Sequence, residues 1–410
     1  MKANSQSKSD KKSLFHKISD IVFRALVVIF IVFGGYYYQV HVMGLKGNLT
    51  KIAGELGREK AINEENLKKL DEVAAEIDKL KAEDQRVRND SLEEEVKNIQ
   101  ETYKKAVGVY DELVDLRAKT KNTTPFDKDF ADALTKLSQR DFAKASEILT
   151  SLTKKIIDEE VKIAATFSIP QNVPESNAPP GSGYSRQSVG VEGLGNYMVS
   201  IVAADLGATR VIVDTASDSD CGNECPVLPL ATYVSRNGAY AGINGSYFCP
   251  SDYASCAGKT NTFDLLVMNS KKTYFNSDNN VYSNNPVVVF GEGYVRFIGA
   301  ASGWGRDTSP NGVLSNYPLL LSGGNITFGG DDDPKKGSRG GRSFVANRGN
   351  TVYIGVVHSS TVAETARVLK TLGMENALNL DNGGSTALWS GGYKAGPGRN
   401  IPNAILFVKK

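Results

Sequence analysis

The chain has 410 residues, of which 40% are hydrophobic and 23% are charged, and its formal net charge at pH 7 is +2. A chain of this length has room for two or more domains. The nearly balanced charge does not favour a nucleic-acid-binding protein, so we expect no nucleic-acid partner.

The N-terminus combines a basic segment with an apolar one. The first 24 residues carry an excess of Lys and Arg, and residues 21–38 are almost entirely apolar and end in three tyrosines. This length can span a bilayer, and tyrosines are typical of its interface. The pattern predicts a cytoplasmic tail (1–20), a single-pass anchor in the cell membrane (21–43) and an extracytoplasmic remainder. A cleaved signal peptide or a buried soluble helix is the alternative, although no small-x-small site follows the apolar core.

Residues 44–167 predict an α-helical or coiled-coil stalk, because apolar residues recur at spacings of three and four among Lys, Glu and Ala. The stalk would space a distal domain from the membrane, and a homodimer through it is possible. Asn122–Pro125 interrupts the pattern, and two amphipathic helices separated near 139–141 follow, similar to one tetratricopeptide-type helix pair. Residues 168–188 contain four prolines and predict an extended linker.

Residues 189–410 predict an α+β domain that is mostly β. Lys and Glu become sparser there, while Gly, Val, Tyr and Asn become more frequent. One long helix pattern is clear, at 361–372, and about 220 residues suffice for one core. Short apolar runs predict strands at 198–202, 210–213, 287–290, 295–298 and 319–321.

All four cysteines fall within this domain, at Cys221, Cys225, Cys249 and Cys256. In an exported domain they favour two disulfides, for which three pairings are possible. Zinc is the alternative, but the spacings C-x3-C and C-x6-C match usual zinc sites poorly. We predict disulfides and leave the pairing open.

A glycine-rich loop follows the apolar run at 377–380. The run reads as a buried strand, and the strand pattern 351–357 and the helix pattern 361–372 precede it. Ligands in such arrangements tend to bind beyond the carboxyl ends of strands, and successive glycines let backbone N–H groups converge on an anion. An ordinary turn is the alternative. The functional interpretation gives the loop a carboxylate, an amide nest and two hydroxyls, from Asp381, Gly383, Gly384, Ser385 and Thr386.

Three further segments accompany this loop: Asn244–Phe248 (Asn-Gly-Ser-Tyr-Phe), Arg342-Ser343, and Arg399 followed by Pro402-Asn403-Ala404. In this order and spacing, the four segments resemble the phosphodiester glycosidase family over roughly residues 189–410. The resemblance implies a hydrolase that cleaves a sugar from a sugar-1-phosphodiester, with no cofactor. One departure is Asn382, where the family commonly has Gly; Asn tolerates left-handed backbone angles, so we expect the loop to persist.

The residue types suit this chemistry. A phosphodiester keeps one negative charge, and Arg donates to it in a fixed fork, so Arg342 is the first candidate for a phosphate clamp and Arg399 the second. Cleavage at C1 passes through an oxocarbenium-like state, which the Asp381 carboxylate would stabilise or attack. Asn244 would hold a sugar hydroxyl or a phosphate oxygen, and the amides and hydroxyls of the loop would position water or phosphate.

Two other functions compete with this one. A serine hydrolase would use Ser385 with His358, although the loop lacks the second glycine of a nucleophile elbow. A non-catalytic module would bind an anionic envelope polymer, which is also the substrate class expected for an extracytoplasmic hydrolase. Acidic runs such as Asp331–Asp333 usually form solvated loops, and a Ca²⁺ site is the less favoured alternative.

Overall fold

The computed structural model describes residues 7–81, 84–278 and 283–410. Residues 1–6 of the predicted cytoplasmic tail lie outside this described part. The chain divides into two compact units, Met1–Glu95 and Val96–Lys410, and each is described by itself.

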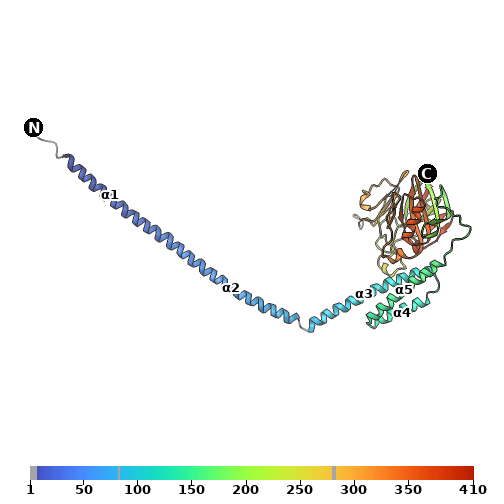
Figure 1. The fold of residues 1–410 in the computed structure, drawn as a ribbon, viewed down its shortest axis with the longest axis horizontal. Coiled ribbons are helices and arrows are strands. Elements are labelled where there is room, and N and C mark those ends of the chain that lie inside the picture. The colour runs from blue at the N-terminus through green and yellow to red at the C-terminus, as the bar shows by residue number, and fades with distance from the viewer. Residues whose placement is uncertain (1–6, 82–83, 279–282) are drawn as a thin grey trace. The chain divides into compact units, whose positions relative to one another are not determined.

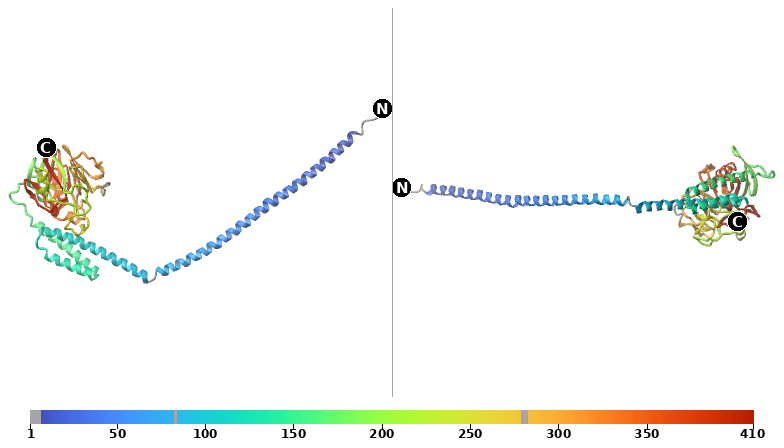
Figure 2. Two further views of the ribbon diagram at one scale, coloured as in Figure 1. Left: turned by 180° about the vertical axis from the view of Figure 1, so that it is seen from behind. Right: turned by 90° about the horizontal axis from the view of Figure 1, so that it is seen from below.

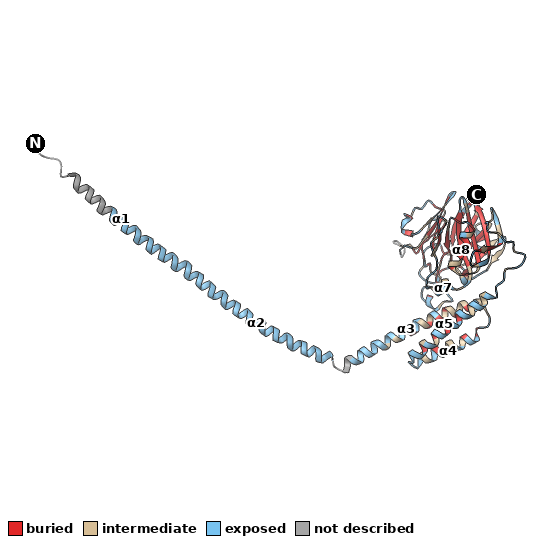
Figure 3. Cartoon of the chain, viewed as in Figure 1, coloured by how far each residue is buried: buried red, intermediate tan, exposed pale blue. Residues whose placement is uncertain are grey.

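The first unit is helical throughout its described part (Figure 1). It contains α1 (Ser7–Tyr37), a π-helical turn η1 (Tyr38–Val42), α2 (Met43–Lys81) and the beginning of α3 (Asp84–Lys119). Figure 3 shows that residues 19–81 are exposed along their whole length. Among the described residues, one helix is long and apolar enough to cross a membrane, and it contains the predicted anchor. A coiled coil requires a partner helix, so coiled-coil pairing of α2 stays a prediction.

The second unit begins with three helices that share a small core. The rest of α3 packs with α4 (Thr124–Ser138) and α5 (Phe142–Ala165), and Figure 2 shows α3, α4 and α5 beside the strand-rich part of this unit. Their shared core contains Leu113, Leu116, Ala133, Leu149 and Leu152. The predicted break at Asn122–Pro125 and the predicted pair of amphipathic helices are confirmed. Residues 96–167 of the predicted stalk therefore belong to the same compact unit as the distal domain.

Three antiparallel sheets form the distal domain. The seven-stranded sheet has the order β1-β2-β13-β12-β14-β10-β11, and the two five-stranded sheets have the orders β16-β15-β4-β17-β3 and β6-β5-β9-β7-β8. In chain order, the strands are β1 (Gly183–Val191), β2 (Gly195–Asp205), β3 (Thr209–Thr215), β4 (Ala241–Asn244), β5 (Val267–Met268), β6 (Tyr274–Phe275), β7 (Val287–Gly291), β8 (Tyr294–Ile298), β9 (Gly312–Ser315), β10 (Leu319–Ser322), β11 (Asn325–Ile326), β12 (Gly340–Arg348), β13 (Thr351–Ser360), β14 (Asn376–Asn379), β15 (Leu388–Ser390), β16 (Tyr393–Ala395) and β17 (Asn403–Lys409).

The sheets enclose one core and carry helices on their outer faces. In β12, Val345 points into the core between the sheets, whereas Phe344 and Ala346 point to the opposite face, as the two-residue period of a strand requires. Helix α8 (Val362–Thr371) covers that outer face of the seven-stranded sheet. Helix α6 (Leu230–Arg236) packs on the outer face of the sheet that contains β4 and β17. Short helical turns occur at Ala254–Cys256, Ala301–Gly303, Pro334–Gly337 and Gly383–Ser385.

Most expectations for this domain are confirmed. It is α+β and mostly β, the predicted apolar runs lie in β2, β3, β7, β8 and β10, and the predicted helix is α8. Thr361 and Glu364 form a capping box at the start of α8. The four cysteines pair as Cys221–Cys225 and Cys249–Cys256. One boundary differs: β1 starts at Gly183, inside the predicted linker, because residues 183–191 pair with β2 along their full length.

Candidate active site

Asp381 lies where the seven-stranded sheet meets the sheet that contains β4. It follows β14, and its backbone N–H donates to the carbonyl of Gly245 at 2.9 Å, just beyond the end of β4. The Asn244 side-chain Nδ2 donates in turn to the carbonyl of Asp381 at 2.7 Å. Two of the predicted segments, about 137 residues apart, are thus fixed to each other at one place.

Asn244 acts as a junction in the interior of the protein. Its side chain is fully buried. Besides the Nδ2 donation, its Oδ1 accepts hydrogen bonds from the Ser343 hydroxyl at 2.8 Å and from the Ala387 N–H at 3.0 Å. Both polar atoms are therefore engaged with other parts of the chain. These contacts favour a positioning role for Asn244 over direct contact with a sugar or a phosphate.

Asn382 fixes the start of the loop to β12. Its Oδ1 accepts from the Ser343 N–H at 2.8 Å, and its Nδ2 donates to Asn379 Oδ1 at 2.9 Å. Its φ of −128° is extended backbone, so no left-handed conformation is required at this position. The left-handed residue is the next one, Gly383, with a φ of 59°. An asparagine is therefore accommodated at 382 for a different reason from the one predicted.

The pKa of the Asp381 carboxyl lies near neutral pH. Burial raises its pKa from 3.8 to about 7, although a hydrogen bond from Ser385, the charge of Arg399 and the Asn382 N–H act in the opposite direction. The Asn382 N–H lies 2.8 Å from Asp381 Oδ1. A carboxyl with this pKa changes charge within the neutral pH range, which is the range in which acid–base groups of enzymes work.

The rest of the loop surrounds this carboxyl. Ser385 is 2% exposed, and its hydroxyl acts to lower the pKa of Asp381. The Thr386 hydroxyl donates to the carbonyl of Gly341 at 3.1 Å and so ties the loop to the start of β12. Gly383 and Gly384 open a single 3-10 turn, where the first N–H groups have no partner inside the turn.

Arg399 packs directly on this loop. Its backbone N–H donates to the carbonyl of Gly384 at 2.7 Å. Its guanidinium lies so close to Gly384 that a Cβ added there would be 2.4 Å from Nη2. Asp252 Oδ2 lies 3.5 Å from the same nitrogen, and the Tyr253 ring centre lies 5.1 Å from Cζ. The side chain packs on the Asp381 loop and keeps 18% of its surface exposed.

Arg342, the first candidate for the phosphate clamp, is engaged by backbone carbonyls. Nε donates to Ser360 at 3.0 Å, and Nη2 donates to Lys335 at 2.9 Å and also to Ser338. The residue is 6% exposed, and burial lowers the pKa of its guanidinium. These bonds attach residues 335–338 to the end of β13, which is a structural task. The contacts therefore favour Arg399 over Arg342 as the anion-facing arginine.

Tyr247 lies near both Asp381 and Arg342 and was not among the predicted site residues. Its hydroxyl accepts a hydrogen bond from Asn379 Nδ2 at 2.8 Å. Burial raises its pKa, and the charges of Asp381 and Arg342 both act on its hydroxyl. Arg342 and Asp381 therefore flank one tyrosine. The only signal for Tyr247 in the sequence was its place in the Asn-Gly-x-Tyr-Phe segment.

The residues of the competing functions have other contacts. His358 Nε2 lies 3.0 Å from the Ser200 hydroxyl, and burial lowers the pKa of His358 to about 4. Ser385, its proposed nucleophile partner, acts on Asp381, whose pKa it lowers. Asp331 and Asp333 both pair with Lys336, and Asp333 also caps a short helix. Within the described ranges, no group of three His, Cys, Asp or Glu residues is arranged to hold a metal.

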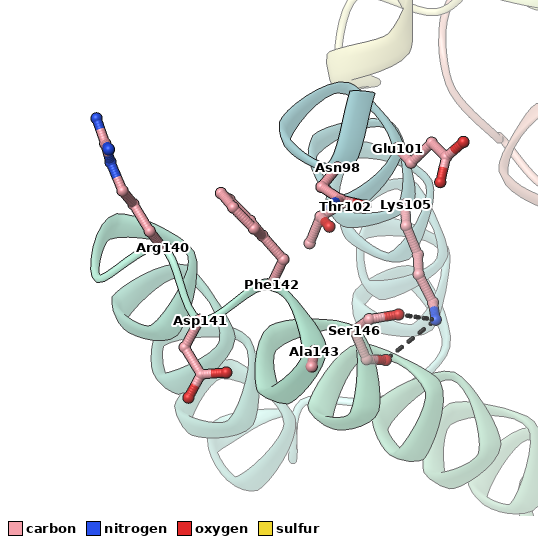
Figure 4. A pocket seen from close by; sticks show the side chains of 9 residues that line it. All are labelled: Asn98, Glu101, Thr102, Lys105, Arg140, Asp141, Phe142, Ala143 and Ser146. Carbon is pink, nitrogen blue, oxygen red and sulfur yellow. Dashed lines mark hydrogen bonds between the residues drawn. The ribbon is translucent and has the colours of Figure 1, made fainter. Parts of the chain in front are cut away.

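A shallow hollow of about 620 Å³ lies on the helices at the start of the second unit (Figure 4). It lies between α3 and the turn that joins α4 to α5. Its lysine, Lys105, already donates to the carbonyl and hydroxyl of Ser146, at 3.0 and 2.9 Å. The hollow shares no residue with the four predicted segments. Its lining residues are Asn98, Glu101, Thr102, Lys105, Arg140, Asp141, Phe142, Ala143 and Ser146.

Comparisons with known proteins complete this description. Residues 237–408 match the family model described as phosphodiester glycosidase. No curated protein matches the chain. Among solved structures, a hypothetical protein from Synechocystis is similar at 14% identity and a TM-score of 0.42, over 57% of this chain and 64% of that one, which is less than two thirds of its length. The catalytic domain of zebrafish N-acetylglucosamine-1-phosphodiester alpha-N-acetylglucosaminidase, auto-inhibited by its pro-peptide, is similar at 15% identity and a TM-score of 0.44, over 58% and 87%.

Proposed function

We propose that the protein is a hydrolase that releases a sugar from a sugar-1-phosphodiester, because residues 237–408 match the family model described as phosphodiester glycosidase. The observation that carries this proposal is the Asp381 loop with the Arg399 guanidinium packed on it. Within the matched residues, it joins a carboxyl whose pKa lies near 7 to a cation that packs on Gly384 of the same loop.

We propose that Arg399 binds the phosphate group of the substrate. A phosphodiester needs a fork of N–H donors, and the Arg399 side chain packs on Gly384 and keeps 18% of its surface exposed. Gly383 and Gly384 have no Cβ, so the backbone N–H groups of the loop can approach an anion closely. Arg342 has a structural role in this proposal, because its guanidinium holds residues 335–338.

Asp381 acts at the sugar. In its ionised form, the carboxylate stabilises or attacks C1 as the bond between C1 and the phosphate oxygen breaks. The electron pair of that bond leaves with the phosphate, which becomes a monoester. Water supplies the hydroxyl at C1 and a proton to the products. A phosphate monoester is a stable leaving group, so a second carboxyl that acts as a strong acid is not needed.

The test is turnover by the full-length chain in detergent. The substrates are benzyl phosphodiesters of the 1-phosphates of N-acetylglucosamine, glucose and galactose, with free reducing sugar and benzyl phosphate measured together. We expect equal amounts of both products, and we expect Asp381→Asn to release neither. Binding without release for every sugar would support a non-catalytic envelope-binding module instead. Turnover that survives in Asp381→Asn but not in His358→Ala would support a serine hydrolase.

We also propose that the domain lies outside the cytoplasm, anchored by the apolar helix. One helix suited to a membrane span and two cysteine pairs support this location. Anionic envelope polymers with sugar-1-phosphodiester bonds would then be within reach. In intact cells, added protease should cleave the distal domain and leave the N-terminal segment protected. Protection of the distal domain until the cells are lysed would contradict this orientation.

A further inference from the structure

Helix α3 holds the loop that Cys249 and Cys256 close, although α3 lies outside the matched residues 237–408. Asp111 Oδ1 accepts a hydrogen bond from the Ala254 N–H at 2.9 Å, and Asp111 Oδ2 accepts one from the Ser255 hydroxyl. Asp111 is only 4% exposed. A carboxylate is buried at little cost only when such partners are present. A helix that merely spaced two domains would not need this contact.

A second carboxylate, one helical turn further along α3, reaches the same loop. Residues four apart lie on one face of a helix, and Asp115 follows Asp111 by four. The Tyr253 hydroxyl donates to Asp115 Oδ1 at 2.5 Å. The same oxygen lies 3.7 Å from Arg399 Nη2. Asp115 therefore touches both the loop and the arginine that we assign to the phosphate.

The loop itself borders Arg399. Asp252 and the ring of Tyr253 both lie against the guanidinium, at the distances given above. Arg399 is thus flanked by two residues of the loop and by one residue of α3. An arginine side chain has many rotamers, and such neighbours restrict it to the one that faces the Asp381 loop.

The helical segment is attached to the domain at a second place. The ring of Phe167, just after α5, stacks on His358 with ring centres 6.3 Å apart. The Ser359 hydroxyl lies 3.5 Å from the carbonyl of Ala164. The segment therefore contacts the domain both at the disulfide-closed loop and at the end of β13.

We propose that α3 is a supporting wall of the active site, and that Asp111 and Asp115 are positioning residues which orient Arg399 through the loop 249–256. This inference rests on the proposed function, because it concerns how the phosphate-binding arginine is held. It also assigns a task to residues 96–119 that a spacer would not have.

Asp111 offers a cleaner test than Asp115. Asp115 lies next to Arg399, so its removal would also remove a negative charge that repels the substrate phosphate, and the two effects would oppose each other. Among the described residues, the hydrogen-bond partners of Asp111 in the loop are Ala254 and Ser255. Its effect on catalysis should therefore arise through the position of the loop.

The experiment measures steady-state kinetics of full-length Asp111→Ala on the benzyl phosphodiester that the wild type turns over best. A misplaced Arg399 weakens substrate and transition state alike, so we expect the KM to rise about tenfold and kcat to stay within about threefold. The pH at which the acid limb of kcat/KM falls should not move. Ser255→Ala removes one hydrogen bond of the same contact and should raise the KM less. The double variant should not exceed Asp111→Ala, because both changes break one contact.

Asp129→Ala is the matched control, since Asp129 pairs with Lys155 within the helices at 2.6 Å and should leave the KM unchanged. Hydrogen exchange of the Ala254 amide provides a readout that does not depend on turnover. In Asp111→Ala this amide loses its acceptor and should exchange at least tenfold faster. The amides of Gly383 to Thr386, beneath Arg399, should also exchange faster.

Each outcome decides the question. Faster exchange at Ala254 with an unchanged KM would overturn the proposal, because α3 would then hold the loop without positioning the site. A lower KM would also overturn it and make α3 a cover that obstructs the substrate. If Asp111→Ala does not fold, Ser255→Ala carries the same test. If the wild type turns over no substrate, the proposed function fails, and exchange at Gly383 to Thr386 still decides whether α3 supports the loop.

Discussion

Replacing Asp381 by Asn should change the stability of the second unit in a pH-dependent way. Folding raises the pKa of Asp381 from 3.8 to about 7, so the folded chain holds this proton more tightly than the unfolded chain. The group therefore favours folding at low pH, and that contribution is lost as pH rises towards 7. At pH 5 the unfolded form is already ionised and the folded form is not. Between pH 5 and pH 7 the wild type should lose about 1.4 kcal/mol per pH unit, or about 3 kcal/mol, with no further loss above.

Asp381→Asn removes this loss, because the amide has no charge to bury. The free energy of unfolding of the variant, relative to the wild type, should therefore be about 3 kcal/mol higher at pH 8 than at pH 5. Both tryptophans, Trp304 and Trp389, lie in the second unit, so urea unfolding followed by tryptophan fluorescence reports on this unit. Asp332→Asn, at an exposed position, is the control for the change from carboxylate to amide. The same difference between variant and wild type at both pH values would refute the argument that burial controls this carboxyl.

Three further predictions concern activity. Since Asp381 must be ionised to stabilise or attack C1, kcat/KM of the wild type should rise with pH through about 7; a rate that falls there instead would make Asp381 an acid. Arg399→Ala should raise the phosphodiester KM about 30-fold or more, as expected when a charge-assisted pair of hydrogen bonds is lost. Arg342→Ala should instead lower the free energy of unfolding by about 3 kcal/mol, because buried carbonyls lose their donors, and should change the KM less. The reverse pattern would restore Arg342 as the clamp. Gly384→Ala should displace the flexible end of Arg399 and reproduce the kinetic defect of Arg399→Ala while the fold is retained; a normal KM would show that the guanidinium is not needed beside Gly384.

Local patterns predicted the elements that depend on local chemistry. The apolar runs at 198–202 and 287–290 predicted strands and the pattern at 361–372 predicted a helix, and the structure has β2, β7 and α8 there. The four segments were also grouped as one candidate site, because their order along the chain resembles that of a known family. Helix α3 had an equally clear helical period, but its period did not reveal what the helix would contact.

Contacts between distant residues explain what the sequence did not reveal. Asp115 and Tyr253 are 138 positions apart, and an acid on a Lys- and Glu-rich helix has no feature that distinguishes it from its solvated neighbours. The contacts of the two arginines could not be read from the sequence for a related reason. Whether a guanidinium meets backbone carbonyls, as Arg342 does, depends on the turn at 335–338, which follows from tertiary packing.

The position of β17 has a consequence for how the protein matures. Asn403–Lys409 lies between β3 and β4, so these two strands have no pairing partner between them until these residues have been synthesised. Asn403 also accepts a hydrogen bond from the Ser246 N–H at 2.9 Å and thereby completes the segment that anchors the Asp381 loop. A ribosome-bound chain that stops before Asn403 would carry every other part of the candidate site and should still be inactive. The site should therefore assemble only after β17 has paired with β3 and β4.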